Sequence, residues 1–215
     1  MAFSLYAATI PSFQQILGAV SVLLDKAETF CAEKGLAPQE LIQARLAVDM
    51  LPFAYQVKST AVHSLGAIEG VRKGVFSPDM TAPPETFAAL KARIAETLTA
   101  LERIDSAEVD GFLGHDMRFA FGNNYRDYTA ENFLLSFSLP NFYFHATTAY
   151  DILRWKGIPL GHRTMKSSVF PPLGRFGHGD LWLKVLCMTS LSQGGYQGKG
   201  AGKDRSRPGL CAFSF

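Results

Sequence analysis

The strongest constraint on this chain is a repeat of apolar residues at steps of three and four in four separate segments. The repeat occupies residues 12–34 and 38–73, and it returns in residues 87–101 and about 130–156. This spacing matches the turn of an α-helix and predicts four amphipathic helices. Each helix has one apolar face to bury, so the predicted fold is all-α, a four-helix bundle.

Glycine and proline residues mark the expected ends and kinks of these helices. Gly35 and Gly157 follow the first and fourth repeats, where glycine ends a helix readily. Pro84 suits the first turn of the third helix, because that turn needs no backbone donor. Pro52 and Pro140 fall inside the second and fourth helices, where loss of a donor predicts a kink in each.

Between the third and fourth helices the apolar period changes to two. Apolar residues alternate from Met117 to Phe121, and the turn signal GNN follows at residues 122–124. Residues 114–128 are therefore predicted to form a short β-hairpin. Thr129 is placed to cap the helix that follows.

Charge and glycine content divide the chain after residue 161. Residues 1–161 carry 13 basic and 17 acidic side chains, whereas residues 162–215 carry 8 and 2, with nine glycines and no sustained period. We expect a bundle domain at 1–161 and an irregular, poorly ordered basic tail at 162–215. A reading-frame change or an unspliced junction would produce such a passage, and mass spectrometry that finds tail peptides in native protein would exclude both.

Composition argues against several classes of partner. The net charge of +2 gives no reason to expect nucleic acid, and the aromatic residues of segment 133–144 are interpreted as core and not as a base-stacking surface. The apolar N-terminus lacks a basic leader, and no uninterrupted apolar run is long enough to span a bilayer, so no membrane is expected. Three scattered cysteines without a CxxC pair fit the cytoplasm.

A polar stripe crosses the apolar side of the fourth helix. Asn141, His145 and Thr148 fall within roughly 60° of one another on a helical projection. The stripe is therefore expected to point inward, where it could contact a ligand. The alternative is structural, because a buried amide or imidazole can satisfy backbone groups that Pro140 frees.

The second helix has a similar stripe within about 80°, made of Arg45, Asp49, Gln56, Thr60 and His63. The two stripes could meet across an interior cavity, where bundles build metal and ligand sites. Two alternatives stay open: Arg45 and Asp49 could form a surface ion pair, and His63 is interpreted as part of a solvated face.

Three segments resemble a known family. They are SLYAATIPSFQQIL near the start, LAVDMLPFAYQV at residues 46–57 and NFYFHATTAYDILRWKGIPLG at residues 141–161. Over about residues 3–161 the chain resembles an uncharacterised domain-of-unknown-function family of the DinB-like superfamily. The resemblance implies a DinB-like four-helix bundle, and a homodimer is expected because members of that superfamily are often dimeric.

The resemblance also implies a site for a divalent metal held by three histidines. One comes from the second helix and two come from an HxxxH pair on the fourth, before a Leu-Arg-x-x-Gly ending that residues 153–157 match. His145 takes the place of the second histidine of that pair and Asn141 the first, while Asp49 or Gln56 stands for the third. His145 and Asp49 are thus the candidate metal ligands, although one imidazole is a weak set for zinc-like ions.

Three functions follow from these residues. The leading hypothesis is a small-molecule-binding bundle without catalysis, with walls from Phe137, Phe144 and Met50 and polar contacts from Asn141, His145, Thr148, Gln56 and Asp49. The resemblance implies the second, a degenerate metal-dependent, thiol-linked transferase or isomerase with unassigned catalytic residues. The third is a non-catalytic dimeric interaction module whose polar stripe fixes helix register.

Overall fold

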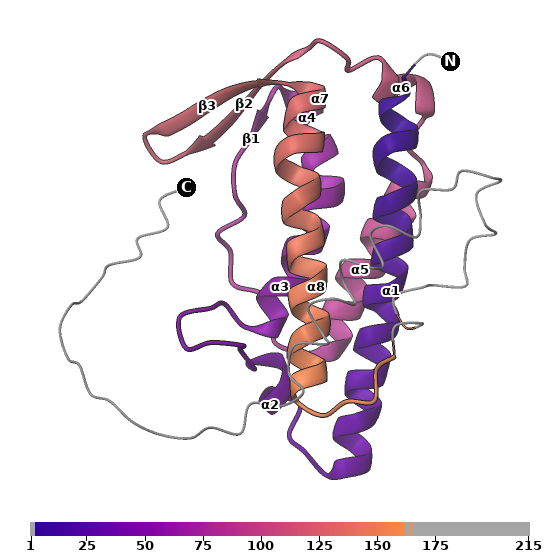
Figure 1. The fold of residues 1–215 in the computed structure, drawn as a ribbon, viewed down its shortest axis with the longest axis vertical. Helices are drawn as coiled ribbons and strands as arrows, with labels where there is room; N and C mark the ends of the chain where they lie inside the picture. Colours follow the sequence, from indigo (N-terminus) through magenta and orange to yellow (C-terminus); the bar gives the residue numbers. More distant parts are fainter. Residues whose placement is uncertain (1–2, 162–163, 165–215) are drawn as a thin grey trace, which may run out of the picture. The chain divides into compact units, whose positions relative to one another are not determined.

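Four helical segments pack side by side, with a small sheet at one end (Figure 1). The structure, a computed structural model, describes residues 3–161 and residue 164. The predicted tail at 162–215, and the domain boundary that precedes it, therefore lie almost entirely outside the described residues. The elements run in the order α1 (Leu5–Lys34), α2 (Gln39–Ile42), α3 (Phe53–Ala61), η1 (Val62–Gly66), α4 (Ala67–Lys73), β1 (Val75–Phe76), α5 (Phe87–Glu102), α6 (Ser106–Asp110), β2 (Asp116–Phe121), β3 (Asn124–Thr129), α7 (Ala130–Asn132), η2 (Phe133–Ser138) and α8 (Leu139–Trp155).

The first helix is longer than the periodicity predicted. It begins after Ser4, whose hydroxyl accepts a hydrogen bond from the Ala7 amide at 3.1 Å, and it ends at Gly35 with a left-handed φ of 65°. Asp110 accepts further hydrogen bonds from Ser4 Oγ and from the Tyr6 amide, which joins α6 to the start of α1. The cap therefore starts the helix before the apolar repeat becomes regular.

Helix α1 packs its buried side against α5 and α8. Among the described residues it is the one helix long and apolar enough to cross a membrane, with a mean hydropathy of 1.4 over 18 residues, 44% of them buried. A core helix of a soluble protein meets the same criterion. The expected absence of a membrane partner stays a prediction.

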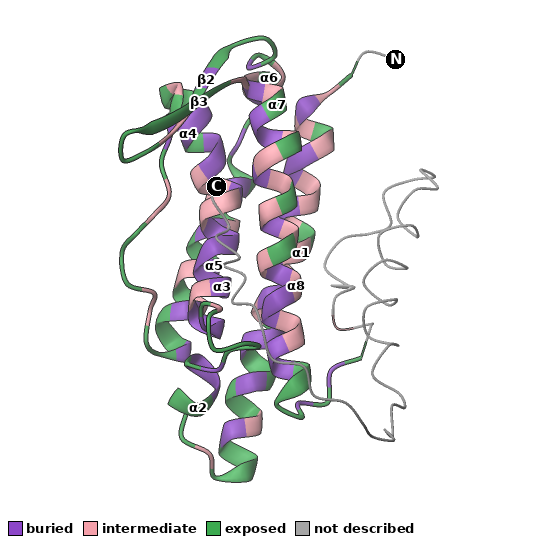
Figure 2. Ribbon diagram, turned by 60° about the vertical axis from the view of Figure 1, so that its left-hand side comes forward, coloured by how far each residue is buried: buried purple, intermediate pink, exposed green. Residues whose placement is uncertain are grey.

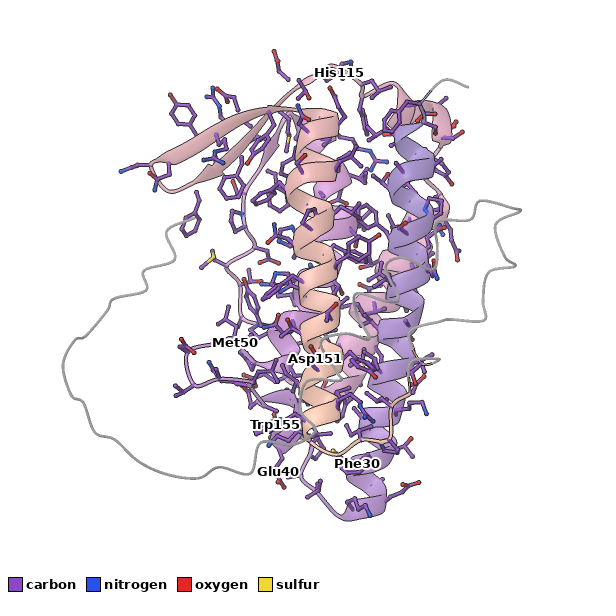
Figure 3. The ribbon with its side chains drawn as sticks, in the orientation of Figure 1. Phe30, Glu40, Met50, His115, Asp151 and Trp155 are labelled. Carbon is purple, nitrogen blue, oxygen red and sulfur yellow. The ribbon has the colours of Figure 1, made fainter. Side chains whose placement is uncertain are left out.

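The prediction of one kinked second helix over residues 38–73 is wrong in residues 43–52. After the single turn of α2, these residues form an irregular, mostly exposed loop, and Met50 lies in its projecting part (Figures 2 and 3). Pro52 stands before α3 with an extended ψ of 169°. A proline before a helix needs no donor, so Pro52 begins a helix here instead of bending one.

The hairpin prediction is confirmed, and the structure adds a third strand. Strands β2 and β3 pair in an antiparallel register that sets Phe121 opposite Asn124, and β1 pairs in parallel with β2 (Figure 1). Gly70 permits this arrangement, because a Cβ there would lie 3.0 Å from Phe76 Cβ. Thr129 occupies the cap position, but its side chain makes no capping hydrogen bond, so that part of the prediction is wrong.

Candidate functional site

Four polar side chains from two facing helical segments meet inside the bundle, and we call them the polar cluster. Gln56 on α3 and His63 on η1 come from the second segment, and Ser138 on η2 and His145 on α8 come from the fourth. Gln56 Oε1 lies 2.7 Å from His145 Nδ1, and Ser138 Oγ lies 3.3 Å from His63 Nδ1. The two imidazoles stack, with ring centroids 5.5 Å apart and an angle of 18° between the planes. Each histidine therefore has a polar partner on the other segment and the second histidine on its face.

The hydrogen-bond network assigns the proton positions on both rings. Gln56 Nε2 donates to the Leu51 carbonyl at 2.9 Å, which turns Oε1 toward His145, so His145 Nδ1 must carry the hydrogen and donate it. Ser138 Oγ donates to the His63 carbonyl at 3.0 Å and is left to accept from His63 Nδ1. In their neutral forms both rings therefore keep a lone pair on Nε2.

The surroundings hold both histidines neutral at pH 7. Burial lowers the pKa of His63 from 6.5 to about 3, and the neighbouring His145 acts in the same direction. Burial alone lowers the pKa of His145 from 6.5 to about 4. These imidazoles thus act as hydrogen-bond acceptors or neutral donor ligands, and not as cations.

Aromatic rings account for that burial. Phe76 and Phe137 lie 5.7 and 5.9 Å from the His63 ring, measured between centroids. Tyr55 and Phe144 lie 6.0 and 5.3 Å from the ring of His145. Apolar faces on both sides of the imidazole pair disfavour the charged forms, because they replace water with a medium of low polarity.

Two π-helical segments place the cluster. His63 lies in η1 and Ser138 ends η2, so the two irregular turns face each other across the bundle. A π-turn widens the helix by one residue, and such turns occur frequently at functional sites. The segment η2 ends two residues before Pro140, which lies in the first turn of α8, and the kink expected there stays a prediction. The Asn141 side chain donates to the Phe137 carbonyl at 2.7 Å. Asn141 therefore serves its own helix backbone, which is the structural alternative that the sequence left open.

The remaining residues of the two stripes lie outside the cluster. Thr148 is buried on α8, but no hydrogen bond in the described part of the chain joins it to the cluster. Asp49 lies exposed in the 43–52 loop and is not on the helix that carries Gln56. Arg45 donates to the Met50 carbonyl at 2.7 Å, and no ion pair with Asp49 is formed.

Sequence reasoning gave little weight to His63 and omitted Ser138. His63 is half-buried and stacked on His145, so its interpretation as a solvated residue is wrong. A signal for Ser138 was present, because Ser138, Asn141, His145 and Thr148 follow one another at steps of three, four and three. The proline between the first two obscured that continuity.

The residues present do not fit the three-histidine metal site that the resemblance implies. Within residues 3–161 and 164, no group of three or more His, Cys, Asp or Glu side chains could hold a metal ion. Asn141 stands for one implied histidine, and Gln56 is one of the two candidates for another; both amides already make internal hydrogen bonds. Amides are also poor ligands for zinc-like ions. The side chains at these positions are therefore a poor match for a catalytic divalent metal.

A pocket of about 570 Å³ lies between η1, α4, β1 and α5. Its lining includes none of the four cluster residues and none of the expected walls Phe137, Phe144 and Met50. Phe144, one of the expected walls, is exposed beside His145, while Phe137 packs on His63. The cluster is therefore a half-buried acceptor surface between helices.

Comparison of the fold places the chain in the DinB-like class of helical bundles. A similar solved structure is the crystal structure of a DinB family member protein from Shewanella denitrificans, with 27% sequence identity and a TM-score of 0.66. The match covers 80% of this chain and 96% of that chain. More specifically, the chain belongs to the family described as domain of unknown function DUF1993, whose sequence profile matches residues 5–165. A comparison with curated proteins found no match.

Proposed function

We propose that this protein binds a small organic molecule at the polar cluster and does not itself catalyse a reaction. The observation that supports the proposal is the pair of neutral imidazoles whose Nδ1 protons are engaged by Gln56 and Ser138. Each ring is left with an Nε2 acceptor beside aromatic side chains. The ligand class that complements this surface has a hydroxyl or amide donor attached to an apolar group.

A catalytic role has weaker support from the same geometry. General bases work best with a pKa near the operating pH, and the pKa of each cluster histidine is well below 7. The metal-dependent alternative lacks its ligand set among the described residues. The dimeric interaction module and the homodimer stay as predictions, without a contact in the described residues that favours either.

A matched pair of probes tests the proposal. Phenol carries a hydroxyl donor on an aromatic ring, and anisole has the same ring with a methyl ether that cannot donate. Addition of phenol to the full chain should move the ¹⁵N resonance of His145 Nε2, and anisole should move it much less. His145→Ala should abolish phenol binding, while His115→Ala should not, because His115 lies exposed before β2 (Figure 3). Equal shifts with both probes, or none, would refute the proposed binding mode.

A further inference from the structure

We infer that the pocket between η1, α4, β1 and α5 is a second ligand site, and that it takes a small zwitterion with an apolar group between or beside its charges. This inference does not depend on the proposed function, since none of the four residues of the polar cluster lines the pocket. The volume of about 570 Å³ falls within the range of about 300–1,000 Å³ that is usual for small-molecule sites.

Small residues create the space of the pocket. Ala61, Gly66, Gly70 and Ala100 contribute at most a methyl group to the lining. At Gly66 an added Cβ would meet no atom closer than 3.8 Å, although its φ of −60° and ψ of −32° are ordinary helical values that any residue adopts. Glycine is therefore not needed for the backbone at this position, and a helix would be more stable with a side chain there. Keeping the pocket open is a role that explains the glycine.

Helices α4 and α5 each contribute one cation and one anion to the lining of the pocket. Glu69 and Lys73 come from α4, and Arg93 and Glu96 come from α5. Within the described residues, none of Glu69, Lys73 and Glu96 forms an ion pair shorter than 4 Å. Glu69 interacts electrostatically with Arg72, but beyond 4 Å. Charges of both signs thus line one pocket without a close ion pair at these three residues, which suits a ligand that carries both an ammonium and a carboxylate.

The fourth charge, Arg93, is only loosely engaged. Its Nη2 lies 3.6 Å from an Asp79 oxygen, whereas Lys58 Nζ approaches the other Asp79 oxygen at 2.9 Å. Lys58 is fully buried and also donates to the carbonyls of Asp79 and Thr81 at 2.8 and 2.6 Å. Lys58 and Thr81 thus act on Asp79 Oδ1, while Arg93 reaches Oδ2 only at 3.6 Å, so the guanidinium has donors left for a carboxylate.

Apolar residues complete the lining. Val62 and Leu65 come from η1, and Val75 and Phe76 come from β1. A ligand with an apolar side chain gains burial against them in addition to its two charged contacts. An α-amino acid with an aromatic side chain is a simple member of that class.

The test uses L-phenylalanine as the probe, with 3-phenylpropanoate and 2-phenylethylamine as analogues that each lack one charge. With the ¹⁵N-labelled full chain, L-phenylalanine should shift the backbone amides of Gly66 and Gly70 in a saturable manner. Each analogue should bind roughly tenfold more weakly, because it loses one charged contact. No saturable shift up to roughly 10 mM, or equal binding of the analogues, would overturn the inference.

A blocking variant makes the site assignment specific. Gly66→Leu should fill the pocket and abolish binding without loss of stability, because the helical backbone accepts a side chain. Ala88→Leu places the same side chain on an exposed position of α5 outside the lining, and it should bind as wild type does. If Gly66→Leu still binds, or if the probe shifts His63 and His145 instead, the pocket is not the site; the latter result would favour the polar cluster.

Discussion

Gln56 Oε1 and His145 Nδ1 lie 2.7 Å apart, joining α3 to α8 through the interior of the bundle. The amide cannot turn freely, because its nitrogen donates to the Leu51 carbonyl where α3 begins. One glutamine thus determines which nitrogen of His145 carries the proton. The Leu51 carbonyl, the Gln56 amide and the His145 imidazole therefore form a continuous chain of hydrogen bonds.

Replacing that amide with a carboxylate should change the titration of the imidazole. In Gln56→Glu the negative charge would favour the imidazolium, so the pKa of His145 should rise from about 4. An NMR titration of the histidine ring nitrogens measures this shift. Gln15→Glu, at an exposed position of α1, serves as the control and should leave His145 unchanged. An unchanged pKa in Gln56→Glu would mean that the side chain turns away from His145.

The two cluster histidines should make stability fall on acidification. Their folded-state pKa values, about 3 for His63 and about 4 for His145, are below the ordinary 6.5. For each histidine, the unfolded chain therefore binds more protons than the folded chain at pH values between its folded-state pKa and 6.5. Their contribution is complete above pH 6.5 and is lost as the pH falls toward about 4 for His145 and about 3 for His63. The slope should reach about 1.4 kcal/mol per pH unit for each histidine.

Urea unfolding across that pH range measures this dependence. The double variant His63→Gln with His145→Gln should flatten the slope, and His115→Gln should keep it, because His115 is exposed outside the cluster. A double variant with the wild-type slope would assign the dependence to other groups.

Loss of the buried Lys58 ammonium should strongly destabilise the chain. Lys58→Met leaves Asp79 without its closest cation and the carbonyls of Asp79 and Thr81 without a donor. We expect a loss of about 3–5 kcal/mol in the free energy of unfolding. Lys91→Met, which removes partly exposed ion pairs to Asp25 and Glu28, should lose less than about 1 kcal/mol. Similar losses for the two variants would show that Lys58 is not buried as described.

Two glycines one helical turn apart should respond in opposite directions to alanine. Gly70→Ala brings a methyl group within 3.0 Å of Phe76 Cβ, and overpacking of this kind costs about 1–3 kcal/mol. At Gly66 the added methyl group makes only ordinary van der Waals contacts, at 3.8 Å or more, and Gly66→Ala should gain about 0.5–1 kcal/mol from helix propensity. Thermal unfolding of both variants checks the prediction, and a stabilised Gly70→Ala would contradict the close approach of β1 to α4.

The full chain, purified without a metal-binding tag, should contain no stoichiometric divalent metal. The reason is the missing ligand set, since Asn141 and either Gln56 or Asp49 stand where the resemblance implies histidines, and no group of three or more metal-binding side chains occurs among the described residues. Elemental analysis of wild type and His145→Ala decides the matter. Stoichiometric metal in the wild type that disappears in the variant would restore the metal-dependent alternative.

Local periodicity was sufficient for most of the helical architecture. The stripes that predicted α1, α5 and α8 come mostly from apolar residues that pack in the bundle, and capping by Ser4 and Gly35 is a local interaction. The apolar periodicity was misleading in residues 43–52, where it predicted a helix and the chain forms a loop. Leu46, a member of that predicted stripe, is exposed and has no apolar surface to pack against. Helical spacing without a partner surface does not hold a helix.

The sequence alone determined the class of fold and two members of the polar cluster, Gln56 and His145, because these depend on spacing along single segments. The family followed from the resemblance of three segments of the chain, and the family match over residues 5–165 shows it. Tertiary structure decided that His63 and Ser138 complete the cluster and that a pocket opens beside Gly66. It also decided that Asp49 lies in the 43–52 loop and not on α3, the helix that carries Gln56. These features depend on two π-turns and on a loop between α2 and α3. Each shifts the register of one helix face against another, and no single-helix pattern records the relative rotation of two helices.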